Sequence, residues 1–286
     1  MQDDECEIYT KIIESINCHD LSKFIDIKIG IVTGANSFFI INQETARVHK
    51  FPKSAIKPIL PKFFLCKGLC LDSNDIEKAR HNNLPCLLIY TKHMRKGGSV
   101  YKYLVGFPKD EKERNRTFKK RAIWHQPDDG KIPDAFFPYM QNYGPKIVLN
   151  RLKITSTNTI HRVYFKPGIN KYMQKLIAIS MLTTFSQLSA EIEGRSYGSG
   201  VLKHEPSEAK KIKIYVPDNN ERKEITKVFN LIDKYLRKGD SESAQKTADA
   251  FIFNGLEKKL GTHFFIKLSS ALSECRFRRQ GKKRNA

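Results

Sequence analysis

The distribution of proline constrains this chain more than any other feature of its sequence. Nine of the twelve prolines fall between residues 52 and 145, and no two are adjacent. A proline inside a helix removes a backbone hydrogen bond and clashes with the preceding turn, so helices in this interval must be short. Strands are predicted instead over 25–31, where isoleucines alternate with other residues, and over 86–91, 146–149 and 159–166.

A turn interrupts the first of these strands. Residues 33–36, Thr-Gly-Ala-Asn, have turn chemistry, and a second strand is predicted over 37–42. The two strands form either a hairpin or one strand with a kink. The longest helix of the first two hundred residues is predicted over 171–192, followed by the glycine-rich loop 194–200.

The pattern becomes helical after Pro217. Apolar residues follow helical spacing from 225 to 236, Gly239 ends that helix, and two more helices are predicted after it. The expected fold is therefore mixed α+β, with a mainly β domain followed by a small helical domain. The expected parts are an N-terminal helix and linker 1–22, an α/β domain 23–217, a helical domain 218–275 and a basic disordered tail 276–286.

The net charge indicates the class of partner. Fifty-one Lys and Arg against thirty Asp and Glu leave a net charge of +21. A chain this basic most often binds nucleic acid. No apolar stretch approaches the ~18 residues that span a bilayer, and the acidic segment Met1–Glu5 does not resemble a secretory signal. We therefore expect a soluble cytoplasmic protein without a membrane partner.

Few residues suggest catalysis or metal binding. Of the six cysteines only Cys66 and Cys70 are close in sequence, and without a second pair they are expected to be core residues. Glu111 and Glu113 superficially suggest a metal-dependent nuclease, but an acidic partner on a clear strand is missing. The surrounding run 109–121 holds seven basic and three acidic residues, which fits a solvated loop or a loop that follows phosphates.

Several short blocks occur in one order between residues 25 and 217. They are 28–40 (KIGIVTGANSFFI), 60–61 (LP), 121–124 (RAIW), 145–150 (PKIVLN), 156–165 (STNTIHRVYF) and 191–208 (EIEGRSYGSGVLKHEPSE). Together they resemble the target-recognition region of adenine-specific DNA methyltransferases from restriction–modification systems. In this group the recognition domain follows the catalytic domain.

The resemblance implies what this chain does not do. Such enzymes transfer a methyl group from S-adenosylmethionine with an Asp/Asn/Ser-Pro-Pro-aromatic tetrapeptide, and this chain has no Pro-Pro pair. We therefore expect no methyl transfer from this chain alone and no cofactor bound by it. Catalysis would come from a separate chain or be missing, and S-adenosylmethionine would belong to that catalytic partner.

The resemblance also implies sequence-specific binding of double-stranded DNA. Lys and Arg would contact phosphates, and a few polar side chains would contact base edges. Two alternatives remain: an RNA-binding or ribosome-associated basic protein, and a nuclease with Glu111 and Glu113. The expected DNA contacts are Thr33, Asn36 and Ser37, then Lys119, Lys120 and Arg121, and finally Arg195, Tyr197, Ser199 and Lys203.

Overall fold

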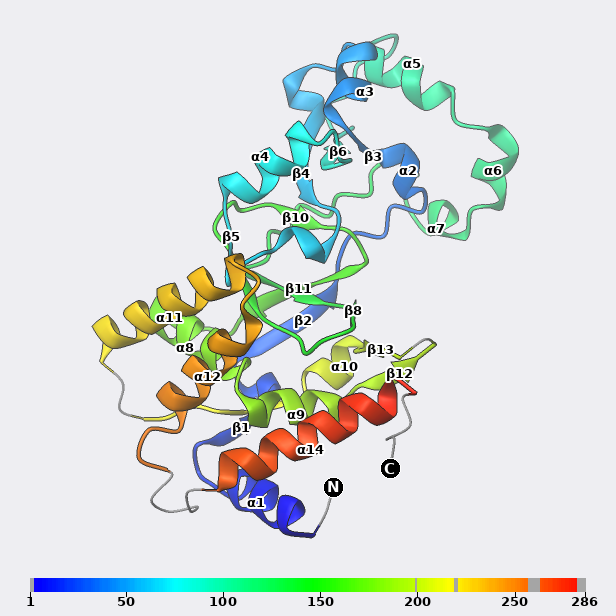
Figure 1. Cartoon of the computed structure of the whole chain (residues 1–286). Coiled ribbons are helices and arrows are strands. Elements are labelled where there is room, and N and C mark those ends of the chain that lie inside the picture. The colour runs from blue at the N-terminus through cyan, green and yellow to red at the C-terminus, as the bar shows by residue number, and fades with distance from the viewer. Residues whose placement is uncertain (1–2, 199, 219–220, 257–262, 282–286) are drawn as a thin grey trace.

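The computed structural model describes residues 3–198, 200–218, 221–256 and 263–281 of the chain. Three tiers of structure follow one another along the molecule (Figure 1). An upper unit of short helices and a four-stranded sheet lies above a central five-stranded sheet, and longer helices form the lower layer. The structure confirms the expected α+β class.

The central sheet is buried on both faces. Phe136 and Phe137 are consecutive in one strand and point to opposite faces, and each lies in a different core cluster. Pairing is antiparallel except for β5 with β9. In spatial order the strands are β2 (Ile25–Ile29), β11 (Ile160–Phe165), β7 (Ala135–Pro138), β9 (Val148–Asn150) and β5 (Cys70–Leu71).

The upper unit is built around aromatic side chains. Phe39 and Phe118 are buried, and Trp124 contacts both rings. Its sheet has the order β10 (Thr155–Ser156), β4 (Ile56–Leu60), β6 (Leu87–Ile89) and β3 (Ile40–Ile41). Its helices are α2 (Asn36–Phe39), α3 (Gln43–Val48), α5 (Ser99–Val105), α6 (Lys109–Arg114) and α7 (Arg116–Lys119), with the 3-10 turn Lys53–Ala55. Between this unit and the central sheet lie α4 (Ser73–His81) and the 3-10 turn Phe63–Leu65.

The lower layer packs helices from both ends of the chain together. One core cluster includes Ile12, Ile214 and Ile225, so buried packing is continuous across the boundary expected near residue 217. The domain division itself stays a prediction. The helices are α1 (Asp3–Ile13), α8 (Lys171–Ser180), α9 (Thr184–Glu193), α10 (Pro206–Ala209), α11 (Arg222–Arg237), α12 (Ser241–Ile252) and α14 (Phe264–Arg279). The remaining elements are β1 (Cys18–Asp20) paired with β14 (Lys213–Tyr215), the 3-10 turn Leu21–Lys23, and a small sheet of β12 (Arg195–Tyr197), β13 (Val201–Lys203) and β8 (Met140–Gln141).

The strand predicted over 37–42 is wrong for most of its length. The chain forms the short helix α2 after the turn, and only β3 is extended. Strand β2 belongs to the central sheet and β3 to the upper sheet, so the two do not form a hairpin. The amide groups of Phe38 and Phe39 both donate to the carbonyl oxygen of Ala35, which starts the helical turn.

The single helix predicted over 171–192 is two helices. Thr183 has extended backbone angles and caps α9, because its hydroxyl oxygen accepts a hydrogen bond from the amide of Ser186. The backbone amide and hydroxyl of Thr184 both donate to buried Asp249, at 2.7 Å each. A hydroxyl pair within an apolar pattern thus ends one helix and starts the next.

Two basic segments are more ordered than expected. Helix α14 continues to Arg279, so the first residues of the expected tail 276–286 are helical, and residues 282–286 lie outside the described part. The run 109–121 forms α6 and α7 instead of an extended loop.

Candidate nucleic-acid interface

Three of the sequence blocks meet at one place in the fold. The amide of Ile31 donates to the carbonyl of Ser156 at 2.8 Å, and the amide of Asn158 donates back to Ile31 at 3.0 Å. The amide of Thr157 donates to the carbonyl of Leu60 at 3.1 Å. We call residues 30–37, 60–61 and 156–159 the junction. It joins β2, β4 and β10, between the central sheet and the upper unit.

Close backbone contact explains the first glycine of these blocks. A Cβ atom on Gly30 would lie 2.1 Å from the carbonyl oxygen of Thr157 and 2.6 Å from that of Ile160. Glycine is therefore required where β2 passes the 157–160 segment. The hydroxyl groups of Thr157 and Thr159 both donate to the carbonyl of Pro61, at 2.9 and 3.3 Å, and close the junction from the other side.

The turn 33–36 presents two of its three predicted contact residues. Thr33 is fully buried, and its hydroxyl donates to the Asn36 Oδ1 at 2.5 Å and accepts from the Ala35 amide. This residue holds the turn and cannot touch DNA, which corrects the prediction for Thr33. Asn36 and Ser37 are exposed, and the Asn36 amide group donates to Asn158 Oδ1 at 3.3 Å.

Arg121 holds α7 against the same turn. Its guanidinium donates to the carbonyl oxygens of Thr33 at 2.8 Å, Trp124 at 3.0 Å and Val32. Burial lowers the pKa of this guanidinium, although an arginine stays charged at any ordinary pH. The side chain of Asn115 adds a bond to the carbonyl of Gly34 at 2.9 Å. Arg121 thus positions the turn and is only partly exposed, and its contact with DNA stays a prediction.

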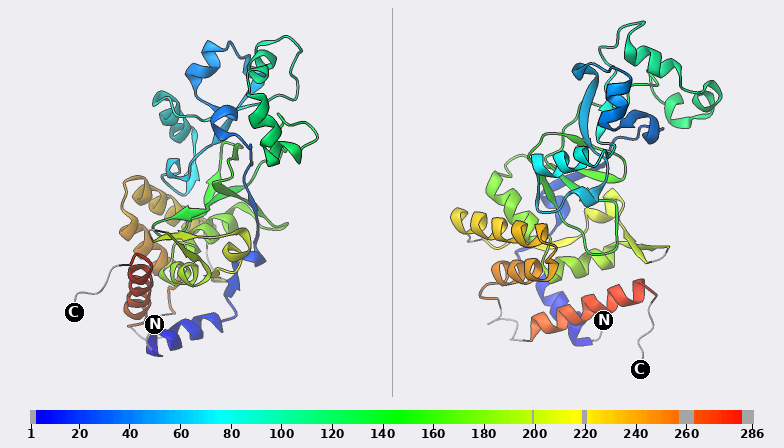
Figure 2. Two further views of the ribbon diagram at one scale, coloured as in Figure 1. Left: turned by 90° about the vertical axis from the view of Figure 1, so that its right-hand side faces the viewer. Right: turned by 45° about the horizontal axis from the view of Figure 1, so that its top comes forward.

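The chain between residues 92 and 121 is strongly basic. It holds eleven Lys and Arg against three carboxylates. Helices α5, α6 and α7 lie in this segment, and they form the outer edge of the upper unit in Figure 1 and in the right-hand view of Figure 2. Lys119 and Lys120 are exposed at the end of α7, beside the turn that carries Asn36. The structure therefore brings the first two groups of predicted contacts together.

The third predicted group lies on the hairpin β12–β13, toward the same side of the molecule but on the lower layer (Figure 1). Arg195 pairs with Glu208 at 2.6 Å, and Lys203 pairs with Glu205 at 3.0 Å. The Lys203 ammonium also lies 5.4 Å from the ring centre of Tyr197, which is 58% exposed. Arg195 and Lys203, two of the predicted DNA contacts on this hairpin, are thus paired with carboxylates. Ser199 lies outside the described residues.

Helix α14 holds this hairpin in place. The guanidinium of Arg279 donates to the carboxylate of Glu191 at 2.7 and 2.9 Å, to the carbonyl of Asn142 at 2.9 Å and to the carbonyl of Gly200. Both charged side chains are nearly inaccessible, with exposed fractions of 5% for Arg279 and 2% for Glu191. The end of α14, which was expected to belong to the basic tail 276–286, therefore fixes the tip of the hairpin.

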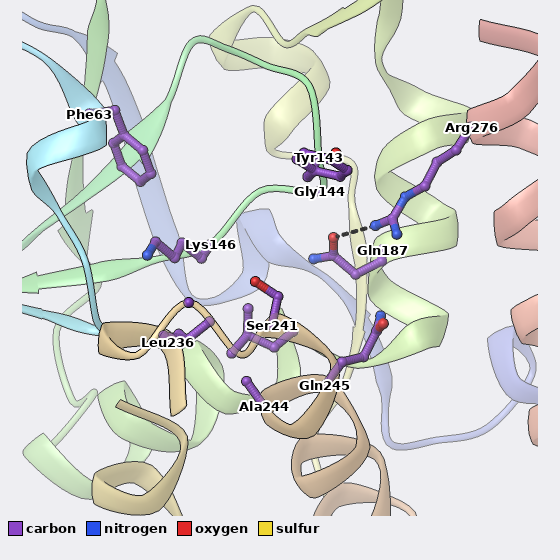
Figure 3. A pocket seen from close by; sticks show the side chains of 12 residues that line it. Phe63, Tyr143, Gly144, Lys146, Gln187, Leu236, Ser241, Ala244, Gln245 and Arg276 are labelled. Carbon is purple, nitrogen blue, oxygen red and sulfur yellow. Dashed lines mark hydrogen bonds between the residues drawn. The ribbon is translucent and has the colours of Figure 1, made fainter. Parts of the chain in front are cut away.

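A pocket lies in the lower layer, away from the junction. Figure 3 shows this cavity of about 440 Å³ between α9, the α11–α12 turn and the loop before β9. Gln187 donates to the carbonyl oxygens of Pro145 and Met181 and accepts from Arg276, so its amide is fully used. Burial lowers the pKa of Lys146 to about 8, and its ammonium donates to the carbonyl of Lys67. These contacts are internal, and we assign the pocket no ligand.

The described residues offer little for metal or membrane chemistry. Within the described ranges no group of three His, Cys, Asp or Glu is placed to hold a metal ion. Cys66 and Cys70 are buried, and burial raises their pKa values to about 12 and about 11. Among the helices that the structure describes, none is long and apolar enough to cross a membrane. Glu111 lies on α6, which buries none of its residues.

Sequence reasoning missed a pocket beside Asn36 and Ser37. This cavity, of about 360 Å³, is also bordered by Lys62 and by Phe64, whose side chain is 59% exposed. The available signal was the pair Phe63-Phe64, which follows the Leu60-Pro61 block after Lys62, because both rings cannot enter one side of a short turn.

Comparisons with known proteins agree with this architecture. The type II methyltransferase M.AccI of Acinetobacter calcoaceticus is 19% identical over 196 residues, which cover 68% of this chain and 36% of that protein. The crystal structure of the type IIG restriction endonuclease BpuSI superimposes with a TM-score of 0.61 at 14% identity, over 97% of this chain and 33% of that chain. The chain thus spans about a third of the length of both proteins.

Sequence similarity defines the class: a protein related to the type II methyltransferases of restriction–modification systems. Within that class the family is shown directly. Residues 1–253 match the family described as the type II methyltransferase M.Eco57I, C-terminal domain, and the chain belongs to it.

Proposed function

We propose that this chain is the DNA target-recognition part of an S-adenosylmethionine-dependent adenine-N6 DNA methyltransferase. It binds double-stranded DNA sequence-specifically. A catalytic portion outside this sequence, or on another chain, supplies methyl transfer and binds the cofactor. The sequence supports this division, because it contains no Pro-Pro pair and so lacks the tetrapeptide that holds the target adenine.

One observation carries the proposal: exposed polar side chains and exposed cations lie together at the junction. Asn36 and Ser37 project from a turn that is fixed by Thr33 and Arg121, and Lys119 and Lys120 lie beside it. A rigid turn can present amide and hydroxyl groups to base edges, while lysines contact phosphates and set the register.

Selection from a random duplex library tests specific binding. The purified chain should enrich one base motif at physiological salt, and the enriched duplex should bind much more tightly than its scrambled form. Equal affinity for both duplexes would contradict the proposal. If hairpin RNA competes better than any duplex, the RNA-binding alternative is correct instead.

The salt dependence of binding tests the role of the two lysines. The logarithm of affinity should fall linearly with the logarithm of salt concentration, and the slope should lose about 1–2 when Lys119 and Lys120 are both changed to Gln. Lys234→Gln, on α11 in the lower layer, serves as the matched control and should leave the slope unchanged. An unchanged slope in the double variant would remove these lysines from the interface.

A further inference from the structure

The pocket beside the junction combines an apolar floor with a polar rim. Buried Ile40, Leu65 and Thr157 form its floor. Asn36 and Ser37 lie on its rim. Its volume, about 360 Å³, lies within the range of small-ligand sites. A flat ring with polar edges fits such a lining, because its face can cover the apolar floor while its edge lies toward Asn36 and Ser37.

An exposed aromatic ring stands at the mouth of this pocket. Phe64 is 59% exposed, although large aromatic side chains are usually buried. The ammonium of Lys67 lies 5.9 Å from its ring centre, and Lys62 borders the pocket. An exposed ring flanked by cations is the arrangement that proteins use to stack a base while holding the adjoining phosphates.

The walls of the pocket are rigid. Thr157 and Thr159 donate to the carbonyl of Pro61, and Asn36 is tied to Asn158 across the junction. A rigid pocket loses little conformational entropy when a ligand enters it. Asn36, which lines the pocket, belongs to the turn that Arg121 holds from the end of α7.

We propose that this pocket receives a nucleobase that has left the stack of bound DNA, with Phe64 stacking on its face. The inference rests on the proposed DNA-binding function and adds a base-accepting site to it. The Asn36 amide and the Ser37 hydroxyl would contact the base edge. This site is separate from the one that would hold the target adenine in the catalytic portion.

Two duplexes that differ at one position test this proposal. One carries a single unpaired thymine, and the other carries an abasic residue at the same place, so the phosphate charges are identical. The chain should bind the first duplex about 5- to 100-fold more tightly, as expected for one stacked base. Affinities are measured by fluorescence anisotropy at one fixed salt concentration.

Matched variants test whether this pocket causes the preference for the duplex with the unpaired thymine. Phe64→Ala should bring the ratio of the two affinities close to one, and Phe64→Trp should retain it. Ser37→Trp, which fills the pocket, should also abolish the ratio. Val105→Ala removes an equally exposed apolar side chain on α5 and should leave the ratio unchanged. Urea midpoints of all variants confirm that each is folded.

The outcomes separate the two proposals. Equal binding of both duplexes by the folded wild-type chain would overturn the pocket and leave the proposed function standing. If Phe64→Ala and Ser37→Trp both keep the wild-type ratio of the two affinities, the base binds at another site, and the assignment of the base to this pocket is overturned. Failure to bind either duplex at low salt would overturn the proposed function together with this inference.

Discussion

Arg237 joins the C-terminal helices to the rest of the molecule. From α11 its Nε contacts Asp233 at 2.8 Å, its Nη1 contacts Asp75 at 2.9 Å and its Nη2 contacts Asp72 at 2.9 Å. The same Nη2 donates to the carbonyl of Cys70 in β5 at 2.8 Å. Burial alone would lower the pKa of Arg237, but the hydrogen bonds to Asp233 and Asp75 outweigh it and raise the pKa.

The substitution Arg237→Gln should therefore be costly. Breaking a fully buried ion pair from one side costs about 3–5 kcal/mol, because the remaining charge is left without a partner. The Asp75 side chain is only 4% exposed, whereas that of Arg237 is 27% exposed. Partial access of water to the arginine lowers the expected loss to about 2–3 kcal/mol of unfolding free energy.

Urea unfolding followed by circular dichroism measures this loss. Arg237→Lys keeps the charge but not the three-sided contact, and should lie between the wild type and Arg237→Gln. Lys238→Gln is the matched control: this neighbouring lysine is exposed, and its loss should change stability by less than about 0.5 kcal/mol.

Hydrogen exchange gives an independent readout at the other end of the contact. Asp233 accepts the amides of Leu69 at 2.7 Å and Cys70 at 3.2 Å. Without Arg237 the Asp233 carboxylate loses its fixed position, so both amides should exchange faster than in the wild type. The result would refute this reasoning if the unfolding free energy of Arg237→Gln lies within about 0.5 kcal/mol of the wild type and both amides exchange at the wild-type rate. The contacts of Arg237 would then not hold the C-terminal helices to the rest of the molecule.

Three further outcomes are expected. Gly30→Ala should lower the unfolding free energy, measured in urea, by about 3 kcal/mol, because the new Cβ would meet the Thr157 carbonyl. The control Gly198→Ala, whose Cβ would meet nothing within 4 Å, should lower it by less than about 0.5 kcal/mol. Equal losses would contradict the close contact at Gly30. Burial lowers the pKa of His204 in the folded chain below its ordinary value of about 6.5. The unfolded chain then takes up a proton that the folded chain does not, so stability should fall as the pH is lowered through about 6.5. In the His204→Gln variant the unfolding free energy should fall less steeply with decreasing pH. If the pH profiles of the variant and the wild type are parallel, His204 does not cause the fall. The purified chain, given S-adenosylmethionine and duplex DNA, should leave adenine unmodified, and N6-methyladenine detected by mass spectrometry would contradict the division of labour.

Several strands could be predicted because alternation and short apolar runs are visible in the sequence itself. The strands expected over 86–91 and 159–166 are present as β6 and β11. Helix ends were harder, since they depend on single side chains. The break before α9 is made by the Thr183 cap and by Asp249, which is 65 residues away from Thr184 in sequence. No local pattern contains that contact.

The candidate site shows the same limit. The sequence blocks located the turn, but they did not separate the residues that build it from those that face outward. Thr33 and Arg121 are consumed by internal hydrogen bonds, whereas Asn36 and Ser37 remain exposed. That separation depends on which carbonyl groups the fold brings near Arg121, and periodicity carries no such information.

Main-chain hydrogen bonds from Ile31 to Ser156 and from Thr157 to Leu60 join the strands of the junction. Exposed side chains at and beside the junction that make none of the supporting bonds, those of Ser37, Lys62 and Phe64, therefore contribute little to folding and can be exchanged while the scaffold stays intact. A library randomised at Ser37, Lys62 and Phe64 would sample new base preferences in variants that still fold. Under the proposed function, a different target sequence would be acquired at little cost in stability, because these three side chains are not among the groups that hold the junction together.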